Sequence, residues 1–332
     1  MALQACAATA WRERSLSVFD DRQAHDYREF CELLFKATPC EPRALCAAGV
    51  ASPEQVFAQA PTGSQLDLAV QAVQGLYGGN AVPRQVSDAR LIVYATSSID
   101  EDPHRSTVSC LAAQFGASAV PHFGLGQLQA ASLDVATELI DGSLSEDGAC
   151  ALFVAAERWP LPYPRLWDGR VMADGAAALW FVRGQQPGLH YLGGIQRGHD
   201  PFVSAEDGAG GGEPRIAYAA IEDAVAEAVI ALLDGQGIGA QDLDGWVCGA
   251  LDAEMDLRLQ QRIGARPRHR VAAPPDAGHL GTVTAPLLLA ELLDQVNTRR
   301  IPHGSLILSW NAGLGGTLTA SLWRASHEGH QT

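Results

Sequence analysis

The 332-residue sequence has little lysine, no long apolar run and no closely paired cysteines, and each shortage excludes a class of protein. Lys36 is the only lysine and the formal net charge is −15, which argues against nucleic acid as a partner. No apolar run approaches the roughly eighteen residues of a membrane span, so we expect no membrane insertion. The seven cysteines are scattered without CxxC spacing, which indicates reduced thiols and no metal cluster.

What remains is the composition of an ordinary globular protein, with 47% apolar and 18% charged residues. The first residues, MALQACAATAWRER, lack a basic segment followed by an apolar one, so we expect no signal peptide. We therefore expect a cytoplasmic protein with no metal and no tightly bound cofactor.

Apolar runs of strand length alternate with amphipathic stretches along the chain. In the first half, the runs 89–95, 149–156 and 174–182 predict buried strands, and 53–59, 63–77 and 106–115 predict helices. In the second half, strands are predicted at 245–249, 270–273, 305–310 and 316–324, and helices at 214–233, 252–263 and 281–296. The alternation favours an α/β protein with parallel sheets covered by helices.

The same order of elements recurs at an offset of roughly 150 residues, which indicates an internal duplication. We therefore predict two similar halves, residues 1–183 and 184–332. The Gly-rich stretch 198–213 has the composition of a linker near the start of the second half.

The stretch 121–141, PHFGLGQLQAASLDVATELID, is the centre of the first half. It predicts a short strand, a tight bend and an amphipathic helix from about Leu128 to Ile140. The first turn of such a helix is electropositive, and this is where a fold places a nucleophile or binds a developing anion. The sequence instead places Gln129 at this bend, and its amide is neither nucleophile nor base.

Four landmarks in the right order carry a resemblance to a known family. They are PHRSTVSCLAAQFG at 103–116, the segment from Phe123, MADGAAA at 172–178, and the C-terminal pair GHLGTVTAP at 278–286 and NAGLGGTLTASL at 311–322. Together they resemble the thiolase superfamily, specifically its β-ketoacyl-acyl-carrier-protein synthase III branch. The resemblance implies pseudo-symmetric βαβαβ halves in layers α-β-α-β-α, and a dimer.

Members of that family use a Cys, a His and an Asn. Carried over by position, the Cys falls on Gln129, the His on or next to Ala250, and the Asn on His279. No histidine lies between His199 and His269, so the resemblance implies a degenerate site. An amide cannot form an acyl-enzyme, which excludes a condensation that passes through residue 129.

Three interpretations remain open. The chain would be a silent partner of a second copy or of a Cys-containing ketosynthase paralogue. Alternatively, Gln129 would mimic an acylated Cys in a malonyl-thioester decarboxylase that uses His279. In the third, Ser132 or His279 would carry an acyl transfer, although Ser132 is also explained as a packed helix residue. In each case the resemblance implies an acyl thioester of coenzyme A or acyl carrier protein as the ligand.

Basic residues concentrate in one part of this acidic chain, at 258–270. The resemblance implies that Arg258, Arg262 and Arg266 dock an acyl carrier protein. Taken alone, the cluster is equally explained as a solvated helix face. The family's N-terminal TGIxxR segment, which helps to bind coenzyme A, has no counterpart here, where KATPCEPRALCAAGV occupies residues 36–50.

Overall fold

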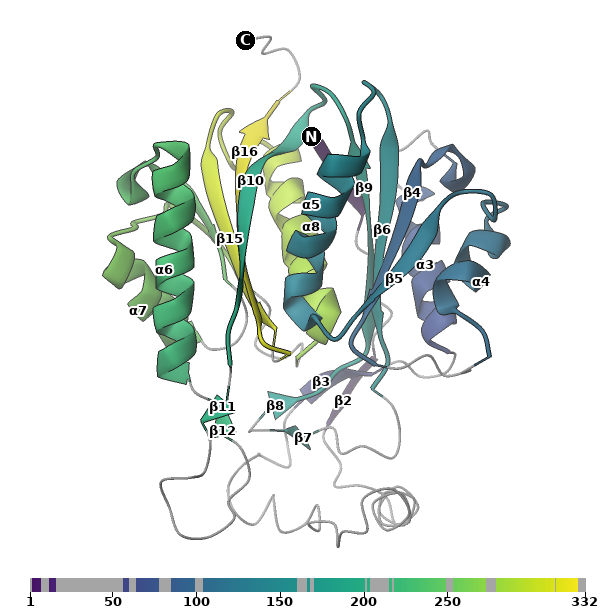
Figure 1. The fold of residues 1–332 in the computed structure, drawn as a ribbon, viewed down its shortest axis with the longest axis horizontal. Helices are drawn as coiled ribbons and strands as arrows, with labels where there is room; N and C mark the ends of the chain where they lie inside the picture. The colour runs from purple at the N-terminus through teal and green to yellow at the C-terminus, as the bar shows by residue number, and fades with distance from the viewer. Residues whose placement is uncertain are drawn as a thin grey trace, which may run out of the picture.

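Ten strands form one mixed sheet in the order β14-β13-β15-β16-β10-β1-β9-β6-β4-β5 (Figure 1). The computed structural model describes residues 2–6, 12–15, 56–59, 64–77, 85–98, 104–159, 166–167, 170–200, 202–203, 215–216, 218–248, 253–272, 279–313 and 315–327. The ten strands are β1 (Ala2–Cys6), β4 (Leu91–Thr96), β5 (His122–Gly126), β6 (Cys150–Glu157), β9 (Gly175–Val182), β10 (Gly188–Gly198), β13 (Gly245–Val247), β14 (His269–Val271), β15 (Leu306–Gly313) and β16 (Thr317–Ser326).

The two ends of this sheet repeat the same pattern of pairing. In the first half, β4 runs parallel to β5 and β6, and β9 runs antiparallel to β6 and β1. In the second half, β13 runs parallel to β14 and β15, and β16 runs antiparallel to β15 and β10. β4 and β13 are therefore equivalent central strands, as the sequence predicts. The two halves join where β1 pairs with β10, and the proposed division after residue 183 stays a prediction.

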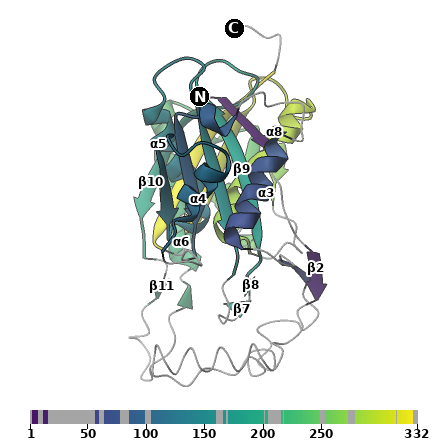
Figure 2. The same ribbon diagram turned by 90° about the vertical axis from the view of Figure 1, so that its right-hand side faces the viewer.

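Six α-helices complete the layers: α3 (Gln65–Tyr77), α4 (Thr107–Gln114), α5 (Ser132–Ser143), α6 (Tyr218–Gln236), α7 (Ala253–Ile263) and α8 (Thr284–Asn297), counted over the described residues. In Figure 1, α5 and α8 lie in the centre, α6 and α7 on the left and α3 and α4 on the right. Figure 2 shows α3 and α4 in front of the sheet. α5 and α8 each contact strands of both halves, so they form the middle layer of an α-β-α-β-α arrangement.

The largest apolar cluster surrounds this middle layer. Leu133 and Ile140 of α5 and Leu288 and Leu292 of α8 are buried together with apolar residues of both half-sheets. Burial of apolar area at about 25 cal/mol per Å² makes such a shared core the main force that holds the halves together. Among the residues that the structure describes, no helix combines the length and apolar character needed to cross a bilayer.

Two local predictions need correction. The helix predicted at 53–59 is wrong at its end, because β3 (Val56–Gln59) pairs antiparallel with β2 (Arg12–Ser15). A helix of so few residues is unstable alone, and a strand partner satisfies its backbone groups better. The predicted linker also contains a strand pair, β11 (Phe202–Val203) with β12 (Arg215–Ile216). A further pair joins β7 (Leu166–Trp167) to β8 (Arg170–Val171).

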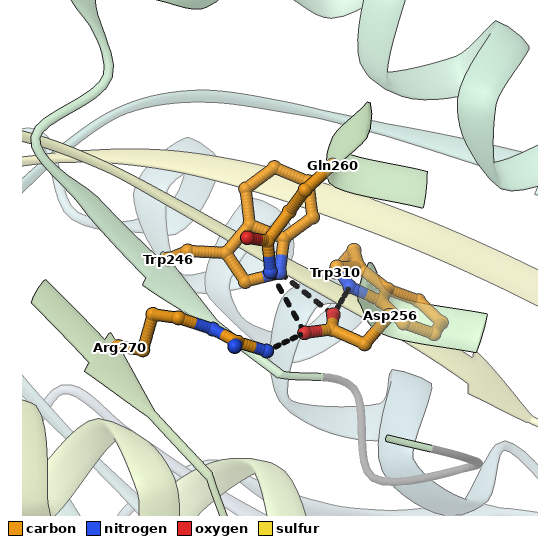
Figure 3. Close-up of polar contacts among 5 residues, drawn as sticks. All are labelled: Trp246, Asp256, Gln260, Arg270 and Trp310. Atoms are coloured by element: carbon orange, nitrogen blue, oxygen red, sulfur yellow. Dashed lines mark hydrogen bonds and ion pairs between the residues drawn. The ribbon is translucent and has the colours of Figure 1, made fainter. Parts of the chain in front are cut away.

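One buried carboxylate fixes α7 against the second half of the sheet (Figure 3). Asp256 Oδ1 accepts hydrogen bonds from the indole N–H groups of Trp246 (2.7 Å) and Trp310 (3.0 Å). Its Oδ2 accepts from Gln260 Nε2 (2.9 Å) and from the guanidinium of Arg270 (2.7 Å). Side chains from β13, β14, β15 and α7 therefore meet at a single residue.

Candidate functional site

The candidate site begins where β5 ends and turns sharply into the middle layer. Gln127 and Gln129 have φ angles of 61° and 47°, the left-handed region that L-residues other than Gly avoid. Gln129 opens a single 3₁₀ turn, η2 (Gln129–Ala131), and α5 follows at Ser132. Each such conformation costs about 1–3 kcal/mol and persists chiefly at functional positions. The predicted bend is thus a strained strand-to-helix elbow with Gln129 at its tip.

The C-terminal Gly-rich segment closes on this elbow. A Cβ at Gly313 would overlap the carbonyl oxygen of Leu128, and a Cβ at Gly315 would overlap that of Gln127. Only glycine permits so close an approach between two backbones. The sequence pattern NAGLGG is therefore explained by its contact with the elbow, which lies about 185 residues earlier in the chain.

A second turn meets the first one. η5 (Gly281–Val283) precedes α8 and contacts η2 directly. His279 lies just before η5, pairs with Met172 in an isolated bridge, and accepts a hydrogen bond on its carbonyl oxygen from Ala173 N–H (2.9 Å). The His279 side chain is half-buried, with its Nε2 atom shielded from solvent. The fold thereby brings the Gln129 turn and the segment that carries His279 to the same place.

Two buried acids hold the helices that start at these turns. Asp134 of α5 accepts hydrogen bonds from Asn311 Nδ2 (2.7 Å), Thr319 Oγ1 (2.6 Å) and Ser321 Oγ (2.6 Å). Burial raises the pKa of Asp134, and these three donors oppose the increase. Glu157, at the end of β6, bonds to Thr282 in the η5 turn, and burial raises its pKa as well.

Comparison with known proteins gives structural matches alone. No family model and no curated protein sequence matches the chain. Among solved structures, ChlB3, described as an acyltransferase, matches with a TM-score of 0.69, 18% identity and 98% of each chain covered. The 3-oxoacyl-(acyl carrier protein) synthase III FabH of Pseudomonas aeruginosa PAO1 matches with a TM-score of 0.67, 17% identity, and 98% and 99% covered. OleA of Xanthomonas campestris gives 0.67, 16%, and 97% and 96%.

The chain has a thiolase-like fold. This confirms the predicted fold class and places the strained elbow and the Gly-rich closing segment within one known architecture. Identities of 16–18% show the fold alone, so the chemistry at Gln129 must be argued from the residues of this chain.

Within this thiolase-like fold, the other predicted site residues have different surroundings. Ser132 is fully buried, and its hydroxyl finds no hydrogen-bond partner among the described residues. A nucleophile must reach its substrate, so this burial favours the packing role of Ser132 over the catalytic one. Ala250 lies outside the described residues. No group of three or more potential metal-binding side chains occurs in the described part of the chain.

The basic cluster is partly neutralised. Arg258 pairs with Glu222 of α6 (3.0 Å), and Arg262 pairs with Asp223 of the same helix. Arg266 follows α7 and is exposed. These exposed pairs contribute little to stability, and they reduce the free positive charge that the sequence indicates at this surface.

Sequence reasoning missed Glu157 and assigned Asp174 only to a turn. Asp174 is fully buried before β9 and accepts a hydrogen bond from Trp159 N–H (2.8 Å). The signal for Glu157 is visible in retrospect, because the apolar strand CALFVAAE ends in a single acid that is itself buried. A buried acid is retained only where donors compensate it.

Proposed function

We propose that the protein is a ketoacyl synthase III-like subunit that binds an acyl thioester and does not condense it. The observation that carries this proposal is Gln129 at the tip of a strained elbow (φ 47°) at the start of α5. The chain retains the strained geometry that presents a nucleophile, while the residue there is an amide. An amide donates and accepts hydrogen bonds to a thioester and has no group that can take up the acyl chain.

The partner is a second copy of the chain or a Cys-containing ketosynthase paralogue. β5 ends the ten-stranded sheet, so its outer edge has no strand partner among the described residues. Its sequence, HFGLG, lacks the lysine, proline or acid that usually protects an edge. Phe123 on β5 and Leu139 on α5 are 36% and 44% exposed, which is expected of apolar side chains that a partner covers.

Acyl carrier protein is the proposed source of the thioester. Because Arg258 and Arg262 already pair with acids, Arg266 is the residue of this group best placed to attract an acidic carrier. Reversing the charge at Arg266 should slow carrier association at low salt and have little effect at high salt. A variant at Arg90, whose exposed pair with Glu146 lies in the other half, is the matched control.

The test combines binding with intact-protein mass. The purified chain is incubated with malonyl and acyl thioesters of coenzyme A and of acyl carrier protein. We expect a thermal shift or calorimetric signal of binding and no mass increase from a covalent acyl group. Gln129→Cys should gain a thiol that reacts with iodoacetamide, because a helix N-terminus favours the thiolate. A turnover-competent acyl adduct on the unmodified chain would contradict the proposal.

Decarboxylation of a malonyl thioester is the second candidate, and His279 favours it. This residue lies just before η5, which contacts the Gln129 turn, so its ring is a candidate donor to a developing enolate. Release of carbon dioxide from malonyl thioester, lost in His279→Ala and retained in His104→Ala, would establish this activity. The absence of release under the same conditions would leave the non-condensing subunit as the function.

A further inference from the structure

The two turns of the site have nearly the same backbone. Leu128 before η2 has φ −93° and ψ −14°, and Leu280 before η5 has φ −90° and ψ 10°. The next residues, Gln129 and Gly281, have φ angles of 47° and 54°. Each turn is followed by a buried helix, α5 or α8. The pseudo-symmetric fold has therefore made two elbows, and they contact one another.

What packs behind the two elbows differs. β15 contacts η2, and the equivalent strand β6 contacts η5. β15 ends in Gly313, whose bare backbone abuts the carbonyl of Leu128. β6 has the same length of 8 residues and ends in Glu157, whose Oε1 lies 3.2 Å from where a Cβ at Gly281 would be. The first elbow faces a glycine and the second faces a carboxylate.

Glu157 makes the contacts of a bound anion. Its Oε1 accepts hydrogen bonds from Thr282 Oγ1 and from Ser97 N–H (2.5 Å), with a longer one from Thr282 N–H (3.5 Å). Its Oε2 accepts from Ser98 Oγ (3.4 Å). Leu280, before the turn, offers no side-chain cap. The unsatisfied N–H groups at the start of η5 therefore receive their acceptor from another strand.

The wider surroundings support this interpretation. Gln65 Nε2 donates to Ser98 Oγ (2.9 Å) and to the carbonyl oxygen of Ala156 (3.0 Å), which orients the hydroxyl that faces Glu157. Burial raises the pKa of Glu157, and the donors Thr282 and Ser97 oppose this increase. A buried carboxylate with donors from three segments is held as firmly as a ligand would be.

We propose that the η5 turn is a carboxylate-binding site that the side chain of Glu157 occupies permanently. This internal ligand holds the turn and thereby positions His279, whereas the equivalent turn at Gln129 has a glycine behind it and stays available for the acyl ligand. Glu157 is thus a positioning residue. The importance of His279 rests on the proposed function, and the occupied carboxylate site does not.

The first experiment copies the free elbow onto the occupied one. Glu157→Gly, in the full chain, removes the carboxylate and imitates Gly313. We expect a lower Tm that sodium formate raises again by about 2 °C or more, compared with sodium chloride at equal ionic strength. The unmodified chain should show no such formate-specific shift. Asp134→Ala is the control, because it removes a buried acid whose donors do not belong to a helix start.

A second variant covers the case in which Glu157→Gly does not fold. Glu157→Gln keeps the size of the side chain and replaces the carboxylate by a weaker acceptor. Hydrogen exchange at Thr282 N–H should accelerate in this variant, while exchange at Ala131 N–H in the η2 turn should not. Equal rates at Thr282 in Glu157→Gln and the unmodified chain would overturn the carboxylate site.

The positioning role has its own readout. Carbethoxylation of His279, followed by peptide mass spectrometry, should be several-fold faster in Glu157→Gly and slow again in formate. Rescue of Tm by chloride as well as by formate would overturn the carboxylate site. Rescue by formate with unchanged reactivity of His279 would overturn the positioning role. Neither result depends on thioester binding, so failure here is distinct from failure of the proposed function.

Discussion

Replacing Asp256 by alanine should be among the most destabilising single changes in the second half. The carboxylate is fully buried and accepts from four donors: the indoles of Trp246 and Trp310, the amide of Gln260 and the guanidinium of Arg270. Arg270 has a side chain that is 39% exposed, so it can turn to water. The two indoles and the amide cannot, and each unsatisfied buried donor costs about 1–3 kcal/mol.

The resulting estimate is a loss of about 3–5 kcal/mol, the range measured when one partner of a buried pair is removed. This is a large part of the roughly 5–15 kcal/mol that stabilises a typical domain. Asp256→Asn keeps one carbonyl oxygen for the two indoles and places an NH₂ group against the other two donors. We therefore expect an intermediate loss of about 1–3 kcal/mol for this variant.

The assay is urea unfolding followed by far-UV circular dichroism, because indole fluorescence would respond to the mutation itself. Asp223→Ala is the matched control: its carboxylate pairs with Arg262 at the surface, and its loss should cost less than about 1 kcal/mol. If Asp256→Ala costs no more than Asp223→Ala, the four donors do not depend on Asp256 and the reasoning is refuted.

Three further outcomes follow from the elbow and its supports. Gly313→Ala should lower the free energy of unfolding by about 1–3 kcal/mol through overlap with Leu128, whereas Gly142→Ala in α5, where a Cβ meets nothing, should raise it by about 0.5–1 kcal/mol; urea unfolding measures both. Gln129→Gly should raise it by up to about 1 kcal/mol, since glycine adopts the left-handed conformation freely; a loss would show that the side chain stabilises the fold. The pKa of Asp134 is raised above its ordinary 3.8, so the folded state binds its proton more tightly, and the stability difference between the unmodified chain and Asp134→Asn should shrink as pH rises above that value; a difference that grows with pH would contradict this.

The sequence predicted the parts of the fold that local patterns determine. β6 and β9 were predicted correctly because every residue in them is buried, which leaves an uninterrupted apolar run. β10 was missed, although it has 11 residues and joins the halves. Its sequence, GLHYLGGIQRG, contains four glycines, and a bulge between Tyr191 and Gly193 breaks its alternation. It therefore resembles a loop until its neighbours are known.

The candidate site divides along the same line. The bend at Gln129 was predicted, because a strand, a turn and a helix follow one another within a single segment. The grip of Glu157 on Thr282 was not, since 125 residues separate them and only the folded sheet brings them together. No local pattern distinguishes an acid that ends a strand in solvent from one that caps a distant helix.

The pairing of β1 with its neighbours has a consequence for synthesis on the ribosome. Residues 2–6 leave the ribosome first, yet their partners are residues 178–182 of β9 and 189–190 of β10. At about 5–20 residues per second, roughly 10–40 seconds pass before either partner exists. During that interval the first strand has unpaired backbone on both sides, so nascent chains risk associating with one another until the seam between the halves can close.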